Sequence, residues 1–191
     1  MYKQWTCRIW TSRTARIELR KFFKIENDFK IFLTKKVLLI LKKQQWGFTK
    51  IFPNQDYLQI FRNSGHTVLY AKVGPVSSNW DRACELYAQI KGLKTDYGHA
   101  HSTTYNHNRY GPDYTGQGFY PQWDGNHLIH FVGHSMGGNT IRMLEWLLQK
   151  GNAAENAASG ANVSGLFGTT KPGGGNWIKS KCLLAFNYYV N

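Results

Sequence analysis

A short glycine-rich stretch carries the residue type best suited to covalent chemistry. Residues 133–138 read Gly-His-Ser-Met-Gly-Gly and contain the pattern Gly-x-Ser-x-Gly. A serine hydroxyl is a weak nucleophile unless the fold exposes it beside a base, and a sharp turn between a strand and a helix exposes it. Gly133 and Gly137 leave room for such a crowded turn. We therefore predict that Ser135 is a nucleophile and that the backbone N–H of Met136 stabilises the oxyanion of an acyl transfer.

The flanking sequence decides between this nucleophile elbow and a glycine-rich turn with an incidental serine. Residues 128–132 form a short apolar run with two β-branched residues and one aromatic residue, which predicts a buried strand. Residues 140–150 predict a helix, and Gly151 stands where a helix-ending glycine is expected. The apolar residues at helical spacing are Ile141, Leu144, Leu147 and Leu148. A strand, the pattern and a helix in this order favour the elbow.

The usual partners of such a serine do not follow it in this sequence. In hydrolases built on this elbow, an acid and then a histidine base come later in the chain. Residues 136–191 contain no aspartate and no histidine, and their only acidic residues are Glu145 and Glu155. This stretch therefore does not supply the expected base.

A second group of residues is suited to holding a metal ion. Residues 96–125 are rich in Tyr, His, Gly, Asn and Pro and lack clear periodicity, so a compact domain needs something to tie them down. Three histidines, His99, His101 and His107, lie there, and with Asp81 they offer the imidazole and carboxylate donors that suit zinc. The alternatives stay open, because Asp81 also fits a helix capping box and loop histidines are usually solvated.

The remaining pattern predicts an α/β domain with a mainly parallel sheet and flanking helices. Residues 54–63 fit a short helix, and residues 66–73 fit a strand. A helix follows with visible ends, because Ser78 is a favourable N-cap and Gly92 stands past the last turn. Alternation of strands and helices of this kind is typical of a parallel sheet.

The net charge of +13 resides mainly in residues 1–45, which hold 12 Lys and Arg against 3 Asp and Glu. A basic segment with interleaved aromatic residues is compatible with nucleic acid or an anionic membrane surface. No recognised binding module accompanies it, so we predict a basic extension and expect no nucleic-acid partner. Its apolar run, Val37–Leu41, is too short and too far along the chain for a secretory signal, but it suits a strand.

One string of residues is more restrictive than the elbow itself. Residues 77–83 read Ser-Ser-Asn-Trp-Asp-Arg-Ala, and Asp96-Tyr97-Gly98 follows before the elbow. Together these resemble the secreted zinc-containing triacylglycerol lipases of the staphylococcal and thermophilic-bacterial type and their fungal relatives, over roughly residues 64–180. The resemblance implies an α/β-hydrolase core, Ser135 as nucleophile, a lipid ester substrate met at a lipid–water interface, and secretion.

The same resemblance implies a structural zinc ion. In that family two histidines and two aspartates hold the metal, and Asp81, His101 and His107 fall on three of the four ligand positions. His99 does not match a ligand. The fourth ligand is expected beyond Asn191, so we expect it to be missing from this chain.

The departures from the family lead to an expectation of incompleteness. Residues 181–191 do not resemble the family's next strand and loop, and the loop that supplies a second oxyanion donor has no clear counterpart. We therefore expect a basic extension over 1–45, a partial lipase domain over 46–180 and a divergent tail over 181–191. The core would be an incomplete α/β-hydrolase core that ends shortly after the elbow helix. Two functions follow: a serine ester hydrolase without its acid and histidine, or an inactive fragment acting as a binding or assembly module.

Overall fold

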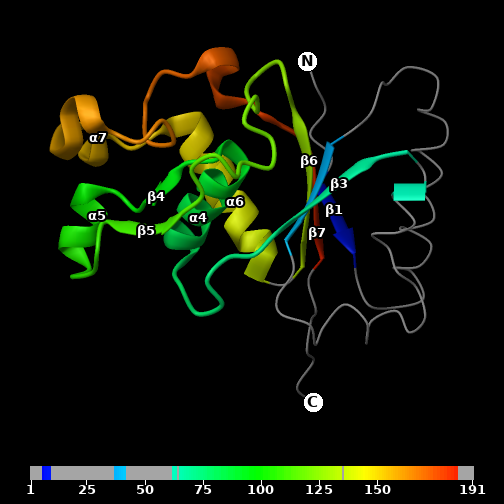
Figure 1. The fold of residues 1–191 in the computed structure, drawn as a ribbon, viewed down its shortest axis with the longest axis horizontal. Helices are drawn as coiled ribbons and strands as arrows, with labels where there is room; N and C mark the ends of the chain where they lie inside the picture. Colours follow the sequence, from blue (N-terminus) through cyan, green and yellow to red (C-terminus); the bar gives the residue numbers. More distant parts are fainter. Residues whose placement is uncertain (1–5, 10–36, 42–61, 64, 135, 185–191) are drawn as a thin grey trace.

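A computed structural model of the chain describes residues 6–9, 37–41, 62–63, 65–134 and 136–184 (Figure 1). The described strands form a five-stranded sheet and a separate two-stranded one. The order of the large sheet is β1 (Thr6–Ile9), β7 (Ile178–Leu184), β6 (Ile129–His134), β2 (Val37–Leu41) and β3 (Thr67–Ala71). Its neighbouring strands all pair in parallel. The predicted mainly parallel sheet is confirmed, with β3 and β6 close to the predicted strands.

Two helices lie on one face of this sheet, α4 (Asn79–Lys91) and α6 (Met136–Lys150) (Figure 1). The apolar positions predicted for α6 face inward, and they complete a core with β6 and α4. Fully buried members of this core are Leu86, Ile90, Trp123, Ile129, Phe131, Ile141, Leu144, Leu147, Leu148 and Phe167. Among the described residues no helix combines the length and apolar character needed to cross a bilayer.

Helix α4 has the ends that the sequence predicted. The Ser78 hydroxyl oxygen accepts from the N–H of Asp81 at 3.0 Å, and Gly92 ends the helix in the left-handed region at φ 72°. The capping box differs in one respect, because the Asp81 carboxylate accepts from the Ser78 hydroxyl at 2.8 Å through Oδ2. This contact fixes the carboxylate with its other oxygen, Oδ1, directed toward α5.

Residues 96–125 contain local structure that the sequence pattern did not predict. A short helix, α5, spans His99–Thr104, and β5 (Tyr110–Asp113) pairs antiparallel with β4 (Lys94–Asp96). Asp96 is the last residue of β4, and Arg109 directly precedes β5. A bidentate ion pair between them closes the loop that connects the two strands, with both N···O distances at 2.9 Å. Bidentate guanidinium–carboxylate pairs hold a defined geometry, so this pair fixes the loop that carries His101 and His107.

Described strands lie on both sides of the boundaries expected at residues 45 and 180. Strands β1 and β2 lie within residues 1–45, which the sequence predicted to be an extension, and β2 sits between β3 and β6 in the sheet. The apolar run Val37–Leu41 is thus a sheet strand, as its composition allowed. Strand β7 crosses the expected boundary at residue 180, because its pairing with β6 continues to Leu184. The predicted helix over 54–63 lies almost wholly outside the described residues.

A half-buried lysine contacts the C-terminal turn of α6. The Lys171 ammonium donates to the carbonyl of Leu147 at 3.2 Å and also contacts the carbonyl of Gly168. Burial lowers the pKa of Lys171 from 10.5 to about 8. In the unfolded chain the amine regains its ordinary pKa, so between these two values the unfolded state binds more protons and stability rises with pH.

We therefore expect Lys171→Met to flatten this rise. The measurement is urea unfolding of both proteins at pH 8 and pH 10, with Lys150→Met, an exposed lysine at the end of α6, as the control. An unchanged pH slope in Lys171→Met would contradict the assignment of that rise to Lys171.

Candidate functional sites

The elbow predicted from sequence lies between a strand and a helix. Strand β6 ends at His134 and helix α6 begins at Met136, so a single residue joins them. That residue, Ser135, lies outside the described residues. The turn around it is closely packed, since a Cβ on Gly133 would stand 2.7 Å from the carbonyl carbon of Gly137 and 2.6 Å from Ile141 Cδ1. Only glycine fits this contact without a shift of the helix.

Met136 is the first residue of α6. The N–H groups of a helix's first turn have no partner within the helix and point out of its N-terminus. The amide of Met136 therefore belongs to a set of donors directed toward the turn at residue 135, where negative charge is stabilised.

An Asp–His pair lies near this elbow in sequence but not in space. Asp124 Oδ1 and His127 Nδ1 are 2.9 Å apart, in the loop that precedes β6. Strand β6 spans six residues, which corresponds to about 17 Å. The pair therefore stands at the opposite end of the strand from His134.

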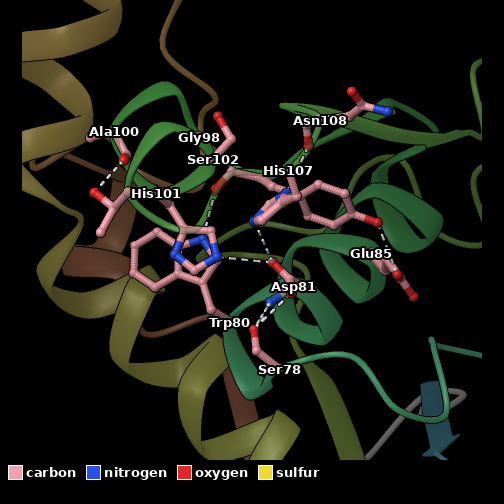
Figure 2. A network of polar contacts seen from close by, with 12 residues as sticks. Ser78, Trp80, Asp81, Glu85, Gly98, Ala100, His101, Ser102, His107 and Asn108 are labelled. Carbon is pink, nitrogen blue, oxygen red and sulfur yellow. Dashed lines mark hydrogen bonds and ion pairs between the residues drawn. The ribbon is translucent and has the colours of Figure 1, made fainter.

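The predicted metal residues are brought together from three parts of the chain. Helix α4 supplies Asp81, helix α5 supplies His101, and the turn after α5 supplies His107. Asp81 Oδ1 lies 3.1 Å from His101 Nε2 and 3.9 Å from His107 Nε2. One candidate ligand atom from each residue lies within 4.8 Å of the others. Figure 2 shows both imidazoles directed at the carboxylate.

The orientation of His107 is set by its other ring nitrogen. Its Nδ1 lies 2.9 Å from the carbonyl oxygen of Asn108, which only accepts, so Nδ1 carries the proton. In the neutral ring, Nε2 then presents a lone pair toward Asp81. The Nε2 lone pair and the Asp81 carboxylate are both acceptors, and a cation between them would stabilise this arrangement. Histidines that ligate a metal commonly have the same geometry, with the second ring nitrogen donating to a carbonyl.

His101 is held by stacking and burial. Its ring lies parallel to the indole of Trp80, with centroids 4.9 Å apart and planes 12° apart (Figure 2). Burial lowers the pKa of His101, which Asp81 opposes by its charge and hydrogen bond. The neutral imidazole that burial favours is the form that binds metal ions.

The separations fit a zinc ion with small adjustments. Ligand atoms bound to zinc at about 2.0–2.2 Å lie at most about 4.4 Å from one another. The two contacts of Asp81 already satisfy this limit, and the ligand atoms of the two histidines lie within 4.8 Å of each other. His99 is exposed at the start of α5 and is not a member of the group.

Two residues around the metal group were not predicted from sequence. Trp80 supports His101, and Glu155 on α7 (Ala153–Ser159) accepts hydrogen bonds from the backbone of α5. Trp80 lies beside Asp81 in the restrictive string, so its position carried some signal. Glu155 lies 54 residues from His101, and no local pattern links them.

Comparison with known proteins gives one consistent result. A family model described as "Lipase-like, C-terminal domain" matches residues 28–187. Lipase 2 of Staphylococcus aureus is 44% identical over 125 residues, which cover 64% of this chain and 17% of that protein. The chain thus spans about a sixth of the length of this relative.

Solved structures with a similar fold carry related descriptions. The structure of lipase 1 from Pelosinus fermentans has a TM-score of 0.67 and 41% identity, and the match covers 81% of this chain and 42% of that one. The crystal structure of Staphylococcus hyicus lipase has a TM-score of 0.61 and 32% identity, covering 80% of this chain and 41% of that one.

Proposed function

The chain belongs to the lipase-like C-terminal domain family, and from that membership we propose that it is a serine ester hydrolase with Ser135 as its nucleophile. The matches also confirm the resemblance to lipases of the staphylococcal type. The observation that carries the proposal is the junction of β6 and α6 at a single residue, with Gly133 packed against the backbone of Gly137. This geometry supports a serine held at a tight turn in front of helix N–H groups.

The proposed reaction is acyl transfer from a lipid ester. Ser135 Oγ bonds to the ester carbonyl carbon while a base takes its proton, and the Met136 N–H stabilises the oxyanion that forms. The C–O bond to the alcohol then breaks, and the alcohol leaves with the proton returned from the base. Water then releases the acid. Residues 136–191 contain no aspartate or histidine, so we expect turnover by this chain to be at least about 10⁴-fold below that of an enzyme with a complete triad.

We further propose a structural zinc ion held by Asp81, His101 and His107. The donor set, the separations and the direction of the His107 lone pair support it. When bound, the ion would join the first turn of α4 to α5 and its following turn, and stabilise the folded chain. Structural zinc ions are four-coordinate, so a fourth ligand would complete the site beside these three residues.

The family also supports a place of action. We propose a secreted protein that meets its substrate at a lipid–water interface, as the resemblance to the staphylococcal-type lipases implies. Hydrolysis of a short-chain triacylglycerol emulsion, compared with a monomeric ester, tests the interface directly, because interfacial action predicts the higher rate on the emulsion.

The test of the nucleophile uses a serine-directed fluorophosphonate and a p-nitrophenyl ester on the purified chain. We expect slow labelling, mapped to Ser135 by peptide mass spectrometry, and none in Ser135→Ala. Labelling of both proteins to the same extent would overturn the assignment. Absence of labelling and turnover in a chain with a cooperative unfolding transition would instead favour the alternative function, an inactive hydrolase module that binds or assembles.

A further inference from the structure

A buried carboxylate outside the metal group contacts the helix that carries His101. Glu155 on α7 is 1% exposed, and its two oxygens accept from consecutive backbone N–H groups of α5. Oε2 lies 3.0 Å from the nitrogen of Ala100, and Oε1 lies 2.7 Å from the nitrogen of His101. One of the donors is thus the backbone of a proposed metal ligand.

The carboxylate is seated closely against the start of α5. Gly98 precedes the helix at φ +94°, and a Cβ there would lie 2.3 Å from Glu155 Cδ. No side chain of α5 caps its own N-terminus. Glu155 therefore takes the place of a capping residue, and the N–H groups it binds offset the cost of burying its charge.

A second route joins the same segment to the ring of His101. The amide side chain of Asn156 donates to the carbonyl of Phe167 at 2.7 Å. The ring of Phe167 lies parallel to that of Trp80, with centroids 5.3 Å apart, and Trp80 in turn stacks on His101. The α7 segment thus constrains His101 both at its backbone and at its ring.

We propose that Glu155 is a positioning residue for the metal site, which holds His101 so that its Nε2 faces Asp81 before a metal ion arrives. The proposal rests on the proposed zinc site and deepens it. A ligand that is already oriented loses little side-chain and backbone freedom on binding, so removing its support weakens metal affinity rather than abolishing it. Because α7 follows α6 in the chain, the contacts of Glu155 with α5 also connect this later segment to the metal group.

The experiment compares Zn²⁺ affinity, measured by competition with a chromophoric chelator, and the visible spectrum of the Co²⁺-loaded protein. Glu155→Gln should bind Zn²⁺ about tenfold more weakly and change the Co²⁺ bands, because His101 shifts relative to Asp81. Glu155→Asp should weaken binding to a similar extent, since its shorter side chain keeps the charge but not both contacts. The matched control is Glu145→Gln, a partly buried acid on α6 that pairs with Lys181.

Each outcome separates the proposal from the zinc site itself. Wild-type affinity and an unchanged Co²⁺ spectrum in Glu155→Gln would overturn the positioning role while leaving the zinc site standing. If Glu155→Asp kept wild-type Zn²⁺ affinity while Glu155→Gln lost it, the loss would be due to charge, and the positioning role would also be overturned. A wild-type chain that binds neither metal would overturn both the zinc site and this inference. Circular dichroism establishes folding of each variant, and Glu155→Asp carries the test if Glu155→Gln does not fold.

Discussion

Replacing Asp81 with Asn should weaken Zn²⁺ binding by more than about 100-fold. Closed structural zinc sites bind with about 10–16 kcal/mol over four ligands, so one ligand accounts for about 3 kcal/mol, or more than two powers of ten in affinity. Asp81 is the central residue of the group, because both imidazoles face its carboxylate. Asn keeps the size of the side chain and loses the charge that balances the metal.

Two measurements check this prediction. Calorimetric titration gives the affinity, and thermal unfolding gives the stabilisation by metal, which should reach about 2.7 kcal/mol for the wild type at 100-fold excess over its dissociation constant. In Asp81→Asn the same concentration of Zn²⁺ should stabilise the fold by at most about 0.4 kcal/mol, and a chelator should remove no more than that. Asp113→Asn, an exposed acid on β5, serves as the control. Equal metal stabilisation of Asp81→Asn and wild type would remove Asp81 from the site.

Replacing Gly133 with Ala should destabilise the chain by about 3 kcal/mol and abolish labelling of Ser135 by the phosphonate. The added Cβ would meet the Gly137 backbone at 2.7–2.8 Å, and a backbone atom cannot rotate away as a side chain can. Overpacking of this kind costs about 1–3 kcal/mol, more where the backbone must move. The helix start would shift away from β6, and the amide of Met136 would move with it.

Urea unfolding and mass-spectrometric labelling measure the two effects. Gly168→Ala is the matched control, because a Cβ there has its nearest neighbour at 3.7 Å and meets only ordinary contacts. It should retain wild-type stability and labelling. If Gly133→Ala matched it in both assays, the close packing of the elbow would not be what presents the serine.

The sequence predicted the parts of the fold whose signals are local. The ends of α4 follow from Ser78 and Gly92, because an N-cap hydroxyl and a left-handed glycine act on neighbouring backbone groups. Strand β6 and helix α6 follow from apolar spacing, since a buried face repeats within a few residues. The metal group was predicted by resemblance, because the spacing of its three residues along the chain fits a capping acid and solvated histidines equally well.

The parts that could not be predicted depend on contacts between distant residues. Thr6 pairs with Lys181, and nothing near either residue specifies the other. Helix α5 has too few residues for a periodic signal, and its N-terminal support comes from Glu155. Strand β7 was not predicted for the same reason, because it is defined by its ladder to β6 rather than by its own composition.

The ion pair between Asp96 and Arg109 has a consequence for the cost of capturing a metal. It joins the two ends of the segment that carries His101 and His107, and Arg109 also donates to the carbonyl of Asn162 at 3.0 Å. Closing a loop costs entropy that grows with the logarithm of its length. Here that cost is met when the chain folds, so an ion would bind to a segment whose two ends are already held together.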